Sequence, residues 1–208
     1  MAQNVRSPTI ELRLGSSEIH DLSIQALKGD GQSAKELASC YRIGYNDYQK
    51  GSEWHLIGAE NRDAGAQYSI SIILRDSTSI LDRERGCYWL YLAIENGHRY
   101  AVNYKKEINK NTYLLEKQKE NSEMININNN NLQEMKIRAM RGNGIIALKI
   151  ANFYEKKNNN EMSFWLRIGA QNGNHDCMRR YGYYLMNTKD KLNKIRGFFW
   201  LERSRSAD

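Results

Sequence analysis

The spacing of the four tryptophans constrains this chain more than any other feature of its sequence. Trp54 and Trp89 lie 35 residues apart, and so do Trp165 and Trp200. The interval between Trp89 and Trp165 is slightly longer than two such units. Self-similarity at a fixed period of about 20 to 50 residues is the signature of repeat architectures. The chain is therefore expected to repeat one small structural unit.

Similar residues surround these tryptophans. The segment 54–59 reads WHLIGA, and the segment 165–170 reads WLRIGA. Gly97 and Gly173 follow their tryptophans by eight residues, whereas Arg62 stands at that place after Trp54. Glycine readily adopts the left-handed conformation that ends many helices, so each of these glycines is expected to end a helix.

A second pattern follows each glycine and Arg62. Small and large apolar residues recur at spacings of three and four, which places them on one face of a helix. Each unit is therefore predicted to be two antiparallel helices, the first with this face and the second with the tryptophan. The sets are Ala34, Leu37, Ala38 and Tyr41; Ala66, Ile70, Ser71 and Leu74; Ala147, Ile150, Ala151 and Tyr154; and Cys177, Tyr181, Gly182 and Leu185.

One helical hairpin cannot bury its apolar face alone, so the units must stack. This predicts an all-α fold, an α-solenoid of about five antiparallel hairpins whose first and last units are incomplete. We expect a single helical-repeat domain over 1–208, with an N-terminal segment at 1–20, first repeats at 22–104 and last repeats at 135–208. The predicted repeat core comprises Leu37, Ala38, Tyr41, Trp54, Ala59, Trp89, Ile150, Ala151, Tyr154, Trp165, Ala170 and Trp200.

These patterns resemble the Sel-1-like repeat, a relative of the tetratricopeptide repeat, over residues 22–104 and 131–203. The resemblance implies helical hairpins in units of about 36 to 44 residues. Two departures are plain, because Arg62 stands where a glycine is expected and the pair 105–106 is Lys-Lys where the family has a Leu-Ala type pair. The residues that carry the resemblance are Ala34, Leu37, Ala38, Tyr41, Gly44, Trp54, Gly58 and Ala59, with the echo Ala147, Ile150, Ala151, Tyr154, Trp165, Gly169, Ala170 and Gly173.

The stretch 105–134 breaks the register of the repeats. It is strongly charged at first and then rich in asparagine, and the run 128–131 should end any helix because asparagine side chains compete for backbone hydrogen bonds. We expect a lengthened central hairpin whose tip, at about residues 121–131, is a loop. Two interpretations stay open: a binding element, because insertions in repeat arrays gather on one face, or a drifted repeat with a polar tip.

No catalytic, cofactor-binding or metal-binding pattern is evident in the sequence. There is no HExxH, no phosphate-binding loop and no GxSxG. The cysteines form no CxxC and no Cys-His pair at ligand spacing. We therefore expect a protein that is not an enzyme and needs no cofactor. The residues considered are His20, His55, His98, His175, Cys40, Cys87 and Cys177.

The net charge of +7 invites a nucleic-acid interpretation, but the 31 Lys and Arg residues are spread among 24 Asp and Glu without a dense basic run. Nucleic acid is thus a remote alternative, and the charge favours steering toward an acidic protein partner. No apolar run approaches the roughly 20 residues of a membrane span, and the first ten residues lack the apolar core of a secretory signal. We expect a cytoplasmic location, or a periplasmic one if a signal segment was removed.

The first helices of a solenoid form its concave surface, which is the default binding site. Candidate contacts are polar or aromatic residues there that the core pattern does not use, and arginine and tyrosine are the types that most often carry interface energy. These candidates are Arg42, Arg75, Tyr104, Arg179, Arg180 and Tyr183.

The resemblance also implies protein binding as the function. Bacterial proteins similar to Sel-1-like repeats include immunity proteins that neutralise secreted toxins, notably phospholipase-type effectors of type VI secretion. The preferred expectation is an inhibitor that binds and blocks one cognate effector toxin at about 1:1. A general adaptor or scaffold protein is the alternative, since fold-level analogy alone does not fix a function.

Overall fold

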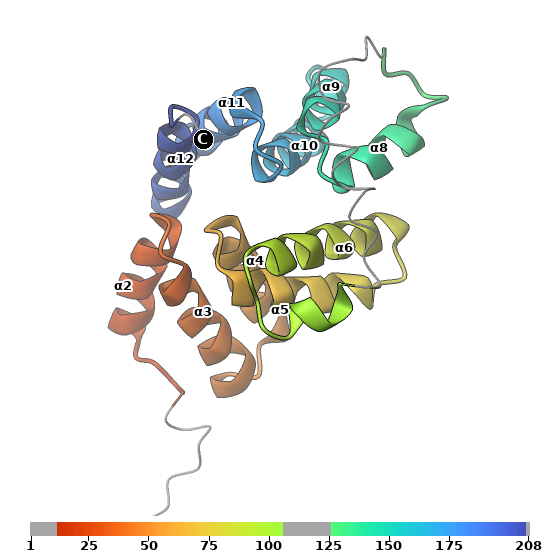
Figure 1. Ribbon diagram of the computed structural model, residues 1–208. Helices are drawn as coiled ribbons and strands as arrows, with labels where there is room; N and C mark the ends of the chain where they lie inside the picture. Colours follow the sequence, from red (N-terminus) through yellow and green to blue (C-terminus); the bar gives the residue numbers. More distant parts are fainter. Residues whose placement is uncertain (1–11, 106–125, 207–208) are drawn as a thin grey trace, which may run out of the picture.

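The computed structural model describes residues 12–105 and 126–206, and within these ranges all regular secondary structure is helical (Figure 1). This confirms the predicted all-α class. None of the described helices is long and apolar enough to cross a bilayer. The ten α-helices of these two ranges are α2 (Ser16–Leu27), α3 (Gly31–Ser39), α4 (Tyr48–Glu60), α5 (Ala64–Arg75), α6 (Ile80–Glu95), α8 (Leu132–Met140), α9 (Gly144–Tyr154), α10 (Asn159–Gln171), α11 (His175–Met186) and α12 (Lys191–Arg203), with a π-helical turn η1 (Cys40–Gly44) and a 3-10 turn η2 (Ala101–Tyr104).

The helices pack in pairs that match the predicted two-helix units. The pairs are α3 with α4, α5 with α6, α9 with α10 and α11 with α12, and each second helix carries one of the four tryptophans. Single helices α2 and α8 pack against the first helix of the pair that follows. Both begin slightly earlier than predicted: α2 starts at Ser16, where the Glu18 side chain accepts the Gly15 N–H at 2.8 Å, and α8 starts at Leu132.

Most of the predicted central hairpin, residues 106–125, lies outside the described residues. The described part of its expected loop tip, 126–131, is not helical, whereas residues 132–134 already belong to α8. There the Asn128 side chain accepts the backbone N–H groups of Asn130 and Asn131 at 2.9 and 3.2 Å, and the Asn131 side chain accepts the Asn128 N–H at 2.9 Å. Asparagine side chains thus take up the backbone donors, as expected of residues that compete with a helix.

The turns between units have the predicted left-handed conformation. Gly29, Gly97, Gly142 and Gly173 have φ values of 117°, 76°, 112° and 91°. Arg62 occupies the equivalent turn with φ of 67°, so an arginine adopts here the conformation that glycine adopts in the other four. This conformation costs a residue with a Cβ roughly 1–2 kcal/mol, because the side chain crowds its own backbone.

The residue that follows each of these turns donates its backbone N–H to a carbonyl near the end of the preceding helix. In four of the five described turns, its side chain also caps the start of the next helix. Asp63 donates its N–H to Gly58 O at 3.1 Å at the end of α4, and its side chain accepts the Ala66 N–H at 2.6 Å at the start of α5. Asp30, Asn143 and Asn174 cap α3, α9 and α11 in the same way. In these four turns one acidic or amide residue therefore links the end of one helix to the start of the next.

The core lies between the paired helices and is built on the repeat positions. Of the twelve predicted repeat-core residues, nine are buried, while Tyr41, Trp54 and Tyr154 are half-buried. Trp89, Trp165 and Trp200 are at most 2% exposed. The recurring tryptophans fill the space between helices, except that the ring of Trp54, in the unit nearest the N-terminus, keeps more contact with solvent.

The described chain also repeats on a larger scale. Helices α2 to α6 correspond in order to α8 to α12, so that the turn at Gly29 matches the turn at Gly142, and Trp54 matches Trp165. Within the described residues, two similar halves of five helices each can thus be distinguished. Each half begins with a single helix and ends with a helix that carries a tryptophan.

The two halves meet through equivalent contacts at both of their ends. Arg85 of α6 donates to Met140 O at 3.3 Å and to the Asn172 side chain at 2.7 Å. Arg196 of α12 donates to Leu27 O at 3.3 Å and to the Asn61 side chain at 2.8 Å. Helix α12 therefore returns to α2, as α6 meets α8, and Figure 1 shows the helices closing around a common centre.

From the sequence we expected the first helices of the units to form the concave surface. The C-terminal ends of the second helices α4, α6, α10 and α12 converge instead on the centre of the array. The buried arginines at the ends of the halves are the physical reason, because each needs the carbonyl and amide acceptors that only the other half supplies.

Replacement of Trp165 by alanine should destabilise the fold by about 3–5 kcal/mol, because it removes a large side chain that is 1% exposed and leaves a cavity. Urea denaturation at pH 7 measures the loss. Phe164→Ala is the matched control, since Phe164 precedes it on α10 and is 45% exposed; it should cost about 1 kcal/mol or less. Equal losses for the two variants would contradict the tryptophan-centred core.

Candidate functional site

Three of the six predicted contact residues lie in one surface groove. Arg42, Arg75 and Tyr104 line an open groove of about 670 Å³ at the N-terminal end of α4 and the C-terminal end of α5. They come from η1, α5 and η2, which the fold brings together from separate repeats. We call this surface the outer groove; its lining residues are Arg42, Tyr48, Ser52, Ile72, Ile73, Arg75, Asp76 and Tyr104.

The arginines of the outer groove lie against tyrosine rings. The Arg42 guanidinium carbon is 5.4 Å from the centroid of the Tyr48 ring, and that of Arg75 is 5.3 Å from the centroid of the Tyr104 ring. Such cation–π contacts attract a guanidinium to the face of the ring and so help to orient it. The groove also exposes apolar surface, since Tyr48 is 59% and Ile72 49% exposed.

Two glycines, separated by one repeat period, give these arginines room. A Cβ at Gly51 would clash with Cγ of Arg42, and a Cβ at Gly86 would lie 2.8 Å from Cγ of Arg75. Each arginine stem therefore crosses the neighbouring helix at a position where only glycine fits. The repeat period thus places the same arginine-over-glycine arrangement in two successive units.

The other three predicted contact residues are on α11 and do not line the outer groove. Arg179 pairs with Asp176 at 2.6 Å, one helical turn away. Arg180 donates to the Asn152 side chain and pairs with Glu155 at 2.8 Å, so it links α11 to the end of α9. Tyr183 is 55% exposed. Their role in partner binding stays a prediction.

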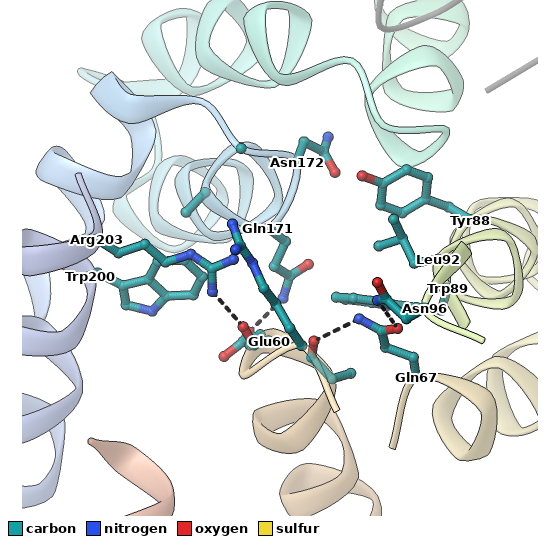
Figure 2. A pocket seen from close by; sticks show the side chains of 14 residues that line it. Glu60, Gln67, Tyr88, Trp89, Leu92, Asn96, Gln171, Asn172, Trp200 and Arg203 are labelled. Carbon is teal, nitrogen blue, oxygen red and sulfur yellow. Dashed lines mark hydrogen bonds between the residues drawn. The ribbon is translucent and has the colours of Figure 1, made fainter. Parts of the chain in front are cut away.

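A second concavity, which the sequence analysis did not predict, lies where the two halves meet (Figure 2). This central cavity has a volume of about 250 Å³ and opens to solvent at a rim that includes Arg62, Asn96 and Gly173, all exposed. Its floor is buried and polar. The cavity is lined by Ala59, Glu60, Arg62, Gln67, Tyr88, Trp89, Leu92, Asn96, Ala170, Gln171, Asn172, Gly173, Trp200 and Arg203.

Glu60 is the centre of a buried network beneath this cavity. The residue is 3% exposed, and its carboxylate accepts from Arg167 Nε and Gln171 Nε2, each at 2.6 Å, and from Arg196 Nη2 at 2.8 Å. Its backbone carbonyl accepts from Arg203 Nη1 at 2.7 Å. Figure 2 shows the Gln171 and Arg203 bonds reaching Glu60 from the other half.

Burial alone would raise the pKa of Glu60, but the charges of Arg167 and Arg196, with hydrogen bonds from Arg167 and Gln171, outweigh it and lower the pKa to about 2. Arg85 is the counterpart of Arg196 in the first half. Its partners are neutral, Gln171 Oε1 at 2.7 Å among them, so burial lowers the pKa of Arg85 to about 10. Both groups remain charged at neutral pH.

Several residues that line the central cavity occupy equivalent positions in the two halves. Some of these pairs are identical and others differ. Trp89 and Trp200 correspond, as do Ala59 and Ala170, in the alignment that matches Trp54 with Trp165. At three positions the halves differ in charge or polarity, and these differences make the cavity asymmetric. The differing pairs are Glu60 with Gln171, Arg62 with Gly173, and Leu92 with Arg203.

One sequence signal indicates that the two halves share a packing contact. Arg85 and Gly86 precede Trp89 in the same way that Arg196 and Gly197 precede Trp200, four and three residues before the ring. Because a buried arginine needs acceptors, this repeated pair indicates the same packing role in both halves. The pattern alone, however, does not say which carbonyls accept.

Comparison with known proteins identifies no relative of this chain. No family model matches the chain, and no curated protein and no solved structure matches it. Among residues 12–105 and 126–206, no group of three or more His, Cys, Asp or Glu side chains is placed to hold a metal ion. The outer groove and the central cavity are therefore the two candidate binding sites of the described chain.

Glu60→Gln should lower stability at pH 7 by roughly 3–5 kcal/mol, because it leaves the buried Arg196 and the half-buried Arg167 without their counter-charge. The Glu60 pKa is lowered on folding, so its contribution is present above about pH 4.5 and is lost as pH falls toward 2. Urea denaturation at pH 7 and pH 3 should show a large difference between wild type and variant at pH 7 and a smaller one at pH 3.

Glu155→Gln is the control for this experiment, because Glu155 forms an ion pair with Arg180 but its side chain is 53% exposed. Exposed pairs contribute about 0–1 kcal/mol, so this variant should remain close to wild type at both pH values. A Glu60→Gln deficit that is independent of pH would show that the carboxylate charge is not what stabilises the centre.

Proposed function

We propose that this chain is a helical-repeat protein of the Sel-1-like kind, a solenoid of about five hairpins, which binds another protein and is not an enzyme. The observation that supports protein binding is the outer groove. There, arginine, tyrosine and isoleucine side chains from neighbouring repeats lie side by side, with Tyr48 and Ile72 exposed. These are residue types and a mixture of apolar and charged surface that are common where proteins bind one another.

We infer an acidic surface on the partner. Arg42 and Arg75 line the groove beside Tyr48 and Tyr104, and the whole chain carries a net charge of +7. Carboxylates can accept two parallel hydrogen bonds from a guanidinium, and long-range attraction raises the rate of encounter. Asp76 at the edge of the groove offers a counterpart for a cation of the partner.

The preferred partner is a cognate effector toxin of phospholipase type, delivered by type VI secretion, which this chain would bind and block at about 1:1. Support for this choice is the resemblance of the repeats together with the basic groove. A general adaptor or scaffold that assembles several proteins is the second candidate. We place an inhibitor of this kind in the cytoplasm, or in the periplasm if a signal segment is removed.

Co-expression with the product of the neighbouring gene tests the proposed inhibitor. The expected result is a complex of one copy of each chain, by size-exclusion chromatography with light scattering, with a dissociation constant of about 1 nM or tighter. Cells that express the toxin should survive when this chain is present. Several weaker partners in a pull-down would favour the scaffold, and neither complex nor protection would refute the inhibitor.

Charge reversal at Arg42 and Arg75 should slow association with the partner roughly tenfold at low salt, because the steering charge changes sign. The matched variant reverses Arg179 and Arg180, which have the same total charge but lie on α11 outside the outer groove. Stopped-flow or surface-plasmon measurements at two salt concentrations compare the two. A slower rate only for the α11 variant would move the binding surface to α11.

A further inference from the structure

Arg62 stands out among the five equivalent turns in the part of the array that the structure describes. The other four have glycine at this place, and Arg62 adopts the same left-handed conformation with φ of 67°. Non-glycine residues in this conformation persist where the surroundings or a function require them. Arg62 is exposed and lies at the rim of the central cavity, where Gly173 occupies the corresponding position in the second half. An arginine in a strained backbone conformation thus lies at the opening of the cavity.

The second cation of the cavity departs from the repeat in a similar way. Arg203 lines the cavity where the equivalent residue of the first half is Leu92. Its guanidinium is positioned by the hydrogen bond from Nη1 to Glu60 O at 2.7 Å. The carboxylate of Glu60 is already bound by Arg167 and Arg196 beneath the cavity. The lining thus carries two guanidinium groups, those of Arg62 and Arg203, beside one carboxylate that has cationic partners of its own.

One part of the cavity wall is aromatic and apolar. Tyr88, Trp89 and Leu92 line it from α6, and Trp200 lines it from α12. Both indole N–H groups are buried without a hydrogen-bond partner. Small-molecule sites typically combine such apolar walls with a few convergent polar groups that fix orientation. A ligand with acceptor oxygens at one end and an apolar body at the other suits this lining.

We propose that the central cavity binds a small organic anion, a carboxylate or phosphate ester with an aromatic or aliphatic body. Arg62 and Arg203 hold the anionic group at the rim, and the body lies against Trp89 and Leu92. The volume of about 250 Å³ accommodates a ligand of this size and excludes a protein segment. This site is independent of the outer groove, so it does not rest on the proposed protein partner.

The two tryptophans of the wall make the test direct. Intrinsic fluorescence of the full chain is followed during titration with phenyl phosphate, benzoate, inorganic phosphate and the neutral benzamide. The expected result is a saturable change with phenyl phosphate or benzoate at a dissociation constant below about 1 mM. Benzamide and inorganic phosphate, which each lack one half of the required chemistry, should bind at least tenfold more weakly. The stronger of the two aromatic anions identifies the anionic group.

Arg62→Gly separates a binding role from a structural one. Glycine adopts the left-handed turn without strain, so the variant should fold and its thermal midpoint should rise by roughly 2–4 °C, while its affinity for the aromatic anion falls at least tenfold. Arg42→Gln is the matched control, because it also removes one positive charge but lies in the outer groove. It should leave the affinity unchanged.

Two outcomes would overturn the proposal. One is the absence of saturable binding by both aromatic anions to the wild-type chain. The other is an Arg62→Gly variant that binds the aromatic anion as tightly as wild type, since the rim guanidinium would then contribute nothing to a ligand. Neither outcome bears on a protein partner at the outer groove, so failure here is distinguishable from failure of the proposed function.

Discussion

The buried carboxylate of Glu60 is the interaction on which the closed arrangement of the helices depends. It binds Arg167 and Arg196, which lie more than a hundred residues further along the chain, and its own backbone carbonyl binds Arg203. One residue of the first half therefore fixes two helices of the second. Because Arg196 is also buried, removal of the Glu60 carboxylate would leave that arginine without its counter-charge, which favours the arrangement that keeps the two halves together.

The helices and their turns could be predicted because their causes are local. The period of the tryptophans, the small residues of the first helices and the turn glycines all act within one unit of about 35 residues, and each agrees with the others. Arg62, the exception among the turns, is likewise visible in the sequence. Closure of the array could not be predicted in this way. It depends on acceptors such as Leu27 O and Met140 O, which every helix end offers and no side-chain pattern identifies.

The candidate site was predicted in part for a related reason. Arg42 and Arg75 gather in one groove because they occupy matching ends of neighbouring units, which the repeat period already implies. Arg180 is also an arginine, and it lies on α11, the helix that corresponds to α5. Its guanidinium is bound by Asn152 and Glu155, whose positions follow from the packing of α11 on α9. The central cavity escaped prediction altogether, since it arises between halves and its lining comes from both.

The two proposed surfaces lie at opposite ends of the same pair of helices. Tyr48 and Ser52, in the first turns of α4, line the outer groove, whereas Ala59 and Glu60, in its last turn, line the central cavity. The helix between these ends is roughly 20 Å long, at about 1.5 Å per residue. Effects of substitutions at that separation usually add, so a variant of one surface serves as a control for the other. The antiparallel pair of α4 and α5 thus gives one rigid element two independent faces, one open to a large partner and one limited to a small ligand.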